Sequence, residues 1–600
     1  MFQPKKHRIA IIGSGPVGLY TAILLKWKYG ESIDVTLIDS HINDYERPGI
    51  IAKKAVQIIN SSFQSRDIPE IDVPDSGGEP ANSVFIGDLQ KSLLKHAQKL
   101  GVNLVEDAFA SLEENTITTK KGQSMTSDLV IDCSGEGRVV ANFTNKRFGG
   151  DSVFNVETIA ENPIKQHFIA YVHMDVENSN LCRMEDLKKR DPVVHAKTME
   201  ELRKTFGWKE FADPEMVVSK WDQKTEGARY CFYFEVPSQV AQAGMKEQEA
   251  YLKALLLLKT GKFIAFEREE GKFKFIPFDV DPKRVLQPVN TTNYSIPVVV
   301  CGDALVSAEY RFGTGVANGV TCASGLVNSI EVTPKEVVIS KDRFEIETRA
   351  TVESHVDEIK KSYQSKRSQL SGRNLVEAFE MYTKALKILA TSEESESDLL
   401  KIEGGLFDLA AKFKESAREK FLQGVDSRKK EQHFIPFFQE AEALYKHALD
   451  IYENYCPNRQ ETKDLHSERA KIYSNLSRVF YQTGRIDEAI QFAEQSLNIA
   501  IKYDIKDMFE SAFVSLEGSC KKALSDYNKD FPNSKWGEKI ELNEKMAKMA
   551  SQIGKDVKPY QEELERLKQK LLEAQSTMKS EMSTMRPDND EKEKHFNLGN

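Results

Sequence analysis

The chain has 600 residues, 40% of them hydrophobic and 29% charged, which is typical of a globular protein of several domains. Its net charge of −9 argues against a nucleic-acid or anionic-membrane binder, and its longest aliphatic run, 254–258, is far shorter than the roughly 20 residues of a membrane span. Seven cysteines without a CxxC motif indicate reduced thiols and no zinc site, so we expect a cytoplasmic protein.

The first motif follows an apolar strand predicted over residues 9–12 and opens an amphipathic helix. It reads Gly13-Ser14-Gly15-Pro16-Val17-Gly18. In such a motif the first glycine permits a tight turn, the second lets the backbone approach a diphosphate, and the third lets the helix pack on the strand. A second strand, 34–38, ends at Asp39 and Ser40, and Asp39 lies 21 residues after Gly18, where a carboxylate can bind a ribose diol. We therefore predict a dinucleotide site, of NAD or FAD type.

The middle of this half is predicted to be a substrate layer of mainly antiparallel sheet over residues 151–290. The candidate strands are 166–172, 228–236 and 272–278, and helices are expected near 184–206 and 246–259. Neither paired acids nor a nucleophile–base set is legible there. His167 and His173 are interpreted as structural or exposed histidines, because a single histidine is a weak signal, and the catalytic residues stay unknown.

A second cofactor motif follows a predicted strand at 297–301. Gly302-Asp303 offers a carboxylate for the ribityl or ribose hydroxyls of FAD. Gly313, Gly315 and Val316 then begin a helix whose N-terminal dipole can stabilise negative charge on a flavin ring. The pair of motifs favours FAD over NAD as the bound cofactor.

These motifs together resemble the FAD fold of the class A flavoprotein monooxygenases (the para-hydroxybenzoate hydroxylase group), and the segment 302–317 resembles the MICAL monooxygenases. The resemblance spans about residues 7–330 and implies NADPH or NADH as reductant. Arg47 resembles an arginine near the FAD diphosphate. Two residues depart from the pattern: Ser134 replaces an aspartate, closer to flavin-dependent halogenases and geranylgeranyl reductases, and Gly87 stands where the hydroxylases often carry an arginine.

The second half of the chain is rich in Glu, Lys, Ala and Leu at helical spacing. Residues 473–497 resemble one tetratricopeptide repeat, with Gly484 at the predicted end of its first helix. Its second-helix pattern recurs at 378–386 and 441–449, at irregular separations. A plain helical bundle would place Ala and Tyr at similar spacing, and that alternative stays open.

The predicted fold class is an α/β FAD-binding domain of the Rossmann type with an inserted antiparallel substrate domain, followed by an all-α tetratricopeptide-like domain. The expected boundaries are 1–150 and 291–335 for the two parts of the FAD domain, 151–290 for the substrate domain, 336–370 for a linker and connecting helix, 371–582 for the helical domain and 583–600 for a disordered tail.

The expected function is an FAD-dependent, NAD(P)H-using monooxygenase acting on a small molecule or a protein, with helical repeats that recruit a protein partner. No metal, nucleic acid or membrane span is expected. Two alternatives remain: a halogenase-like or reductase-like flavin oxidoreductase of a small molecule, and a flavin-containing interaction scaffold.

Overall fold

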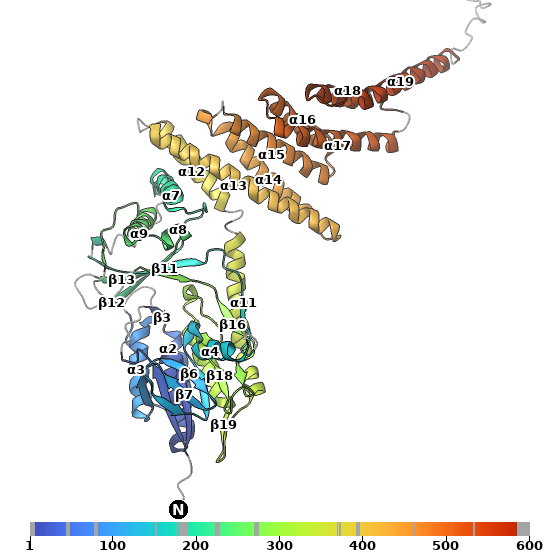
Figure 1. The fold of residues 1–600 in the computed structure, drawn as a ribbon. Coiled ribbons are helices and arrows are strands. Elements are labelled where there is room, and N and C mark those ends of the chain that lie inside the picture. The colour runs from blue at the N-terminus through green and yellow to red at the C-terminus, as the bar shows by residue number, and fades with distance from the viewer. Residues whose placement is uncertain are drawn as a thin grey trace, which may run out of the picture. The chain divides into compact units, whose positions relative to one another are not determined.

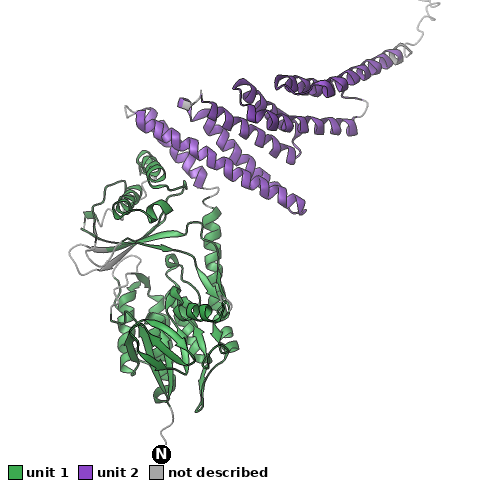
Figure 2. Cartoon of the chain, in the orientation of Figure 1, with its two compact units in different colours: residues 1–370 green, residues 371–600 purple. Residues whose placement is uncertain are grey.

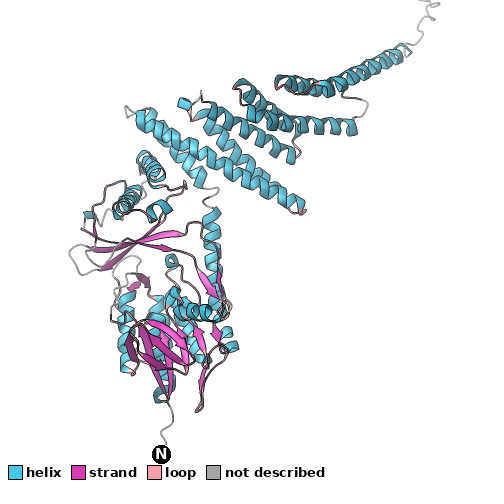
Figure 3. Ribbon diagram, in the orientation of Figure 1, coloured by secondary structure: helices cyan, strands magenta, loops and turns pink. Residues whose placement is uncertain are grey.

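The computed structural model forms two compact units, residues 1–370 and 371–600 (Figure 2). Among the described residues, strands occur only in the first unit (Figure 3). The described residues are 6–43, 49–76, 82–149, 153–175, 177–178, 190–222, 228–268, 275–368, 370, 374–391, 396–459, 462–531 and 534–584.

The larger of the two main sheets in the described part of the first unit is mainly parallel (Figure 1), with strand order β17-β18-β9-β1-β2-β5. Only β17 and β18 pair antiparallel. Its apolar runs are buried because helix α1 packs on the sheet and contacts α3 and α10. These elements are β1 (His7–Ile12), β2 (Ile33–Asp39), β5 (Asn103–Glu106), β9 (Leu129–Asp132), β17 (Val289–Asn290), β18 (Val298–Val300), α1 (Pro16–Tyr29), α3 (Ile86–Lys99) and α10 (Gly315–Ser329).

The register of this sheet aligns three strand ends. Ile12 of β1 and Val300 of β18 both pair with Asp132 of β9. The loops that follow these strands therefore leave the same carboxyl edge of the sheet, which is where ligands bind in open α/β folds.

Smaller elements surround this sheet. A three-stranded antiparallel sheet, β6-β7-β8, contacts α4, and two short strand pairs, β3–β4 and β10–β16, lie outside the main sheets. Their bounds are β3 (Ile50–Ala52), β4 (Ser83–Phe85), β6 (Phe109–Glu113), β7 (Thr116–Thr119), β8 (Ser124–Thr126), β10 (Val156–Thr158), β16 (Lys283–Val285), α2 (Lys54–Gln64) and α4 (Val139–Phe148).

The second large sheet of the first unit is antiparallel, as expected for the middle region. Its order is β12-β13-β11-β14, and β15 also pairs with β11. Of the predicted strand 272–278 and helix 184–206, residues 272–274 and 184–189 lie outside the described part of the chain. The elements are β11 (Gln166–Met174), β12 (Met216–Asp222), β13 (Ala228–Glu235), β14 (Glu267–Arg268), β15 (Ile276–Asp279), α7 (Pro192–Phe206), α8 (Ser238–Ala241) and α9 (Met245–Thr260).

The expected linker, 336–370, is instead an integral part of the first unit. Strand β20 (Val337–Ile339) pairs with β19 (Ile330–Val332), and helix α11 (Lys341–Ser368) packs along α10. Apolar side chains of this otherwise charged helix, among them Val356, Ile359 and Tyr363, are buried in the same core as the parallel sheet. Their helical spacing places them on one face, and burial of that face against the core explains the difference.

The second unit is helical throughout its described residues. Gly484 has φ +81° and follows the end of α15, as the repeat pattern predicts. The expected disordered tail, 583–600, lies outside the described residues except for its first two, which end α19. The helices are α12 (Asn374–Ala390), α13 (Glu396–Lys429), α14 (Ile435–Asn454), α15 (Lys463–Gln482), α16 (Ile486–Lys502), α17 (Lys506–Asp530), α18 (Trp536–Gln552) and α19 (Lys558–Thr584).

Candidate functional site

The glycine-rich turn after β1 is shaped by the packing of the chain on itself. Gly13 has φ +109°, and a Cβ atom there would lie 2.3 Å from the carbonyl oxygen of Cys133. A Cβ atom on Gly18 would lie 2.0 Å from the carbonyl oxygen of Gly13. Both contacts are impossible for real atoms, so the turn itself requires these two glycines.

Gly15 is different, because nothing in the described chain requires a glycine there. Its φ is −63°, and a Cβ atom would meet no heavy atom within 4 Å. Helix α1 begins directly after it at Pro16 and has no side-chain cap. The turn therefore presents open backbone and a helix N-terminus to the space in front of it, and a diphosphate can use both features.

Val17 joins this turn to the second motif. A Cβ atom on Gly302, whose φ is +67°, would lie 3.0 Å from Cγ1 of Val17, and one on Gly319 would lie 2.5 Å from Cγ2. The side chain of Val17 thus packs between the loop after β18 and helix α10. Three segments that are far apart in the sequence meet at one residue, on the carboxyl edge of the parallel sheet.

The Gly-Asp loop lies against the start of α10. Oδ1 of Asp303 is 3.6 Å from the position that a Cβ atom on Gly315 would occupy. Thr314 precedes the helix without capping it, and its buried Oγ1 has no hydrogen-bond partner within the described structure. Gly313 has φ +63°, and Val316 is half-buried against the core. A carboxylate, an unpaired hydroxyl and an uncapped helix N-terminus therefore lie together.

Asp39 has a role in the turn that the sequence did not reveal. Its carboxylate accepts hydrogen bonds from the backbone N–H of Ser14 at 2.7 Å and of His41 at 2.9 Å. Ser40 Oγ lies 2.8 Å from Nδ1 of His41. The acid expected to bind ribose therefore also fixes the glycine turn. Arg47, which was expected near the diphosphate, lies outside the described residues.

The departure from the family pattern at Ser134 has a local explanation. The buried carboxylate of Asp132 accepts hydrogen bonds from Ser134 Oγ at 2.5 Å, and from the backbone N–H groups of Val140 and Ala141, each at 3.0 Å. Ser134 Oγ in turn accepts from the N–H of Val139 at 2.9 Å. Ser134 and Asp132 therefore bind the free backbone N–H groups at the start of α4.

Arg138 is a buried residue of this region that was not among the predicted site residues. It adopts the left-handed conformation, with φ +43°. Its guanidinium donates to the carbonyl oxygen of Ala304 at 3.0 Å, to Ser307 Oγ at 2.7 Å and to the carbonyl oxygen of Lys283 at 3.1 Å. Arg138 thereby fixes the Gly-Asp loop to the loop after β9. These three acceptors are more than 140 residues away, so no local signal identifies this role.

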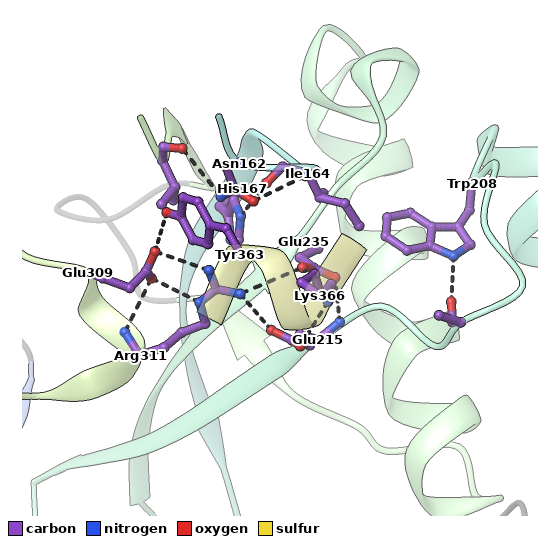
Figure 4. A network of polar contacts seen from close by, with 12 residues as sticks. Asn162, Ile164, His167, Trp208, Glu215, Glu235, Glu309, Arg311, Tyr363 and Lys366 are labelled. Atoms are coloured by element: carbon purple, nitrogen blue, oxygen red, sulfur yellow. Dashed lines mark hydrogen bonds and ion pairs between the residues drawn. The ribbon is translucent and has the colours of Figure 1, made fainter. Parts of the chain in front are cut away.

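A network of charges links Glu309 and Arg311 to the antiparallel sheet and to the end of α11 (Figure 4). Arg311 donates to Glu309 through Nε at 2.9 Å and Nη2 at 3.0 Å, and to Glu215 through Nη1 at 2.7 Å. Nζ of Lys366 lies 2.8 Å from carboxylate oxygens of both Glu215 and Glu235. Tyr363 Oη donates to Glu309 at 2.5 Å. These contacts fix the loop that leads to Gly313.

His167 lies beside this network and is buried. Nε2 lies 3.0 Å from the carbonyl oxygen of Ile164, so it carries the proton, and Nδ1 accepts from the Tyr310 hydroxyl at 2.9 Å. Burial lowers the pKa of His167 to about 4, so the ring is neutral near pH 7. Both ring nitrogens are engaged, which fits the structural role expected for this histidine.

Comparison with known proteins gives one family match and several similar solved structures. Residues 437–502 match the tetratricopeptide repeat family, whereas no curated protein matches. The Diels-Alderase PyrE3 of pyrroindomycin biosynthesis is 15% identical, covering 66% of this chain and 80% of that chain, with a TM-score of 0.39. 2-Methyl-3-hydroxypyridine-5-carboxylic acid oxygenase is 14% identical, covering 61% of this chain and 93% of that chain, with a TM-score of 0.37. The tetracycline destructase Tet(51) is 13% identical, covering 65% of this chain and 99% of that chain, with a TM-score of 0.38.

The predicted architecture is confirmed at the level of its units. The first unit combines a mainly parallel α/β sheet with a separate antiparallel sheet, and the second is helical and contains the tetratricopeptide match. Within the described part of the chain, no helix combines the length and the apolar character of a membrane span.

Proposed function

We propose that the chain is an FAD-dependent, NAD(P)H-using monooxygenase. The observation that carries this proposal is the packing of Val17 between Gly302 and Gly319, which joins the glycine turn, the Gly-Asp loop and the start of α10. FAD is long enough to contact all three, because its diphosphate lies between the adenosine and the ribityl chain that carries the flavin. A nicotinamide site in the first motif alone would not explain the second motif.

The residues at this edge fit the parts of FAD in order. Gly13 to Gly18 would hold the diphosphate, with Ser14, Pro16 and Val17 shaping the turn. Asp39 and Ser40 would serve the adenosine end, and Arg47 would lie near the diphosphate. The carboxylate of Asp303 would accept from ribityl or ribose hydroxyls, and the segment Gly313–Val316 would lie at the flavin.

Bound FAD supplies the electron transfer and the oxygen chemistry, which protein side chains do not provide. The chain contributes position and electrostatics. The N-terminal dipole of α10 favours negative charge at the ring, and the hydroxyl of Thr314 is available to donate a hydrogen bond there. Arg138 and the network around Arg311 hold the Gly-Asp loop and its continuation in place. We assign no catalytic base.

The helical unit would recruit a protein partner, which the tetratricopeptide match supports. Such repeats stack into extended surfaces that bind other chains. We place the protein in the cytoplasm because of its cysteine usage, and we expect a substrate that is a small molecule or a protein side chain.

The proposed reaction is tested by mixing the FAD-loaded chain with NADPH or NADH. We expect anaerobic bleaching of the flavin by at least one nucleotide, and oxygen consumption above that of free FAD when air is admitted. Asp303→Ala, which loses a charge-assisted hydrogen bond, is expected to bind FAD roughly tenfold to a hundredfold more weakly. Bound flavin that neither nucleotide reduces would contradict the proposal that NADPH or NADH is the reductant. Reduction of the flavin without oxygen consumption would favour a reductase.

A further inference from the structure

We propose that Glu136 is a further residue of the flavin site and that it binds FAD in its protonated form, so that FAD binding takes up a proton. Glu136 lies in the loop after β9, within the short 3-10 helix Gly135–Gly137. The cofactor motifs of the sequence did not indicate this residue. Its role rests on the FAD site proposed above and adds a proton to the binding reaction.

The loop after β9 is the middle one of three loops at the carboxyl edge of the parallel sheet. Strand β9 lies between β1 and β18, and the pairing of Asp132 with Ile12 and with Val300 aligns the ends of the three strands. The glycine turn follows β1, and the Gly-Asp loop follows β18. A dinucleotide that contacts both of these loops therefore passes in front of the loop after β9.

Arg138 fixes the backbone of Glu136 against the Gly-Asp loop. Its guanidinium donates from Nη1 to the carbonyl oxygen of Glu136 at 2.9 Å, and from Nη2 to the carbonyl oxygen of Asp303 at 3.3 Å. The 3-10 helix that contains Glu136 also contacts the 3-10 helix Gly302–Ala304 directly. Glu136 is thereby held beside the residue whose carboxylate is proposed to bind ribityl or ribose hydroxyls.

The side chain of Glu136 remains available for a ligand. Glu136 is exposed, and its carboxyl group has no hydrogen bond or ion pair within the described part of the chain. By contrast, the Ser134 hydroxyl bonds to Asp132 and to the N–H of Val139, and Arg138 donates to carbonyl groups. A ligand that crosses this loop can therefore reach the carboxyl group of Glu136 without displacing a contact within the protein.

The charge of the ligand decides which form of Glu136 can bind it. A carboxylate would repel the diphosphate of FAD, whereas a protonated carboxyl group can donate a hydrogen bond to it. Although part of the side chain is open to solvent, burial among the neighbouring loops raises the pKa of Glu136 to about 7. The charges of Asp303 and Glu309 also raise this pKa, and those of Arg138 and Lys283 lower it. Bound FAD adds further negative charge, which favours the protonated form.

The affinity for FAD is therefore expected to fall as the pH rises. Above pH 7 the unbound protein has lost the proton of Glu136, so that binding of FAD takes one up from solvent. Each pH unit above this pKa lowers the affinity by up to about tenfold, and we expect a fall of at least about tenfold between pH 6 and pH 8.5. Glu136→Gln keeps a hydrogen-bond donor that does not ionise. Its affinity should not change with pH and should exceed that of the parent at pH 8.5 by about tenfold.

The test is isothermal titration of the full chain with FAD at pH 6 and at pH 8.5, for the parent and for Glu136→Gln. His41→Gln is the control, because a histidine also changes its charge in this pH range and His41 lies beside Asp39. This control should keep the pH dependence of the parent. Titration of the parent at pH 8 in Hepes and in Tris, whose heats of ionisation differ, should show an uptake close to one proton, which Glu136→Gln should lack.

Equal affinity of the parent for FAD at the two pH values would overturn the proposal. So would a Glu136→Gln variant that keeps the pH dependence of the parent. Either result would leave the FAD site itself in place, whereas absence of FAD binding at both pH values would overturn the FAD site together with this role.

A measurement without flavin tests the state of Glu136 in the unbound protein. A carboxyl group with a raised pKa contributes stability that is complete below its unfolded pKa and is lost as the pH rises through its folded pKa. The melting temperature of Glu136→Gln, relative to that of the parent, should therefore be higher at pH 8.5 than at pH 5.5. The same difference between the two proteins at both pH values would show that Glu136 is already ionised at pH 5.5, which would also overturn the proposal.

Discussion

Replacement of Gly15 by alanine is expected to weaken FAD binding about a hundredfold without destabilising the apoprotein. Gly15 has an ordinary φ of −63°, and the added Cβ meets no atom of the protein within 4 Å. The same Cβ would occupy the space in which the diphosphate approaches the backbone. Loss of two hydrogen bonds to the diphosphate, at about 1.4 kcal/mol each, corresponds to about a hundredfold in affinity.

Gly18→Ala is the matched control for this prediction. Its Cβ would lie 2.0 Å from the carbonyl oxygen of Gly13, so the substitution strains the turn itself. We expect this variant to lose thermal stability and FAD together, whereas Gly15→Ala loses FAD alone. Isothermal titration with FAD and the apoprotein melting temperature distinguish the two. FAD affinity of Gly15→Ala equal to that of the parent would show that no ligand approaches this turn.

Lys366→Met is expected to destabilise the first unit by about 3–5 kcal/mol at pH 8, because it removes the nearer of the two cations beside a buried carboxylate and leaves only Arg311, 4.0 Å away. The side chain of Glu235 is fully buried and lies 2.8 Å from Lys366, which is itself 8% exposed. The substitution also removes one of the two cations that contact Glu215. Since Lys366 lies near the end of α11, the loss of stability also measures how much the contacts of this helix stabilise the first unit.

The destabilisation should be smaller at pH 5 than at pH 8. Burial raises the pKa of Glu235, and Lys366 acts in the opposite direction, so the variant has a still higher pKa. Such a carboxyl group has a higher pKa in the folded than in the unfolded state. Its contribution to the free energy of unfolding is complete below the unfolded pKa and is lost as the pH rises through the folded pKa. Urea unfolding of the parent and the variant at both pH values measures the destabilisation at each pH.

The neighbouring residue supplies the control. Arg367 is 53% exposed, and its Nη2 lies 3.8 Å from Glu161 Oε2 and donates to the carbonyl oxygen of Glu161 at 2.6 Å. Because these contacts are exposed to solvent, Arg367→Met should cost less than about 1 kcal/mol at either pH. Similar losses for the two variants, or a Lys366→Met variant that is as stable as the parent, would contradict the role assigned to the network in Figure 4.

Much of the fold could be predicted because its signals are local. Strand β2, Ile33–Asp39, contains the predicted strand 34–38 and ends at the acid that the motif spacing indicated. Helix α15 ends before Gly484, where the positive φ suits glycine. The glycine turn after β1 is likewise where the motif placed it, and Gly13 and Gly18 are required there by steric contact.

The features that were missed depend on contacts between distant segments. Helix α11 has a charged composition and resembles a connector until the core that buries Ile359 and Tyr363 is known. Arg138 donates to Ala304, which is 166 residues away.

The most direct test of the account is the absorption spectrum of the full chain after incubation with FAD and removal of unbound flavin. We predict retained flavin absorbance that corresponds to one FAD per chain, with band shapes altered from those of free FAD by the protein environment. Colourless protein that also shows no saturable binding when titrated with FAD would contradict the assignment of the site at Val17, Gly302 and Gly319.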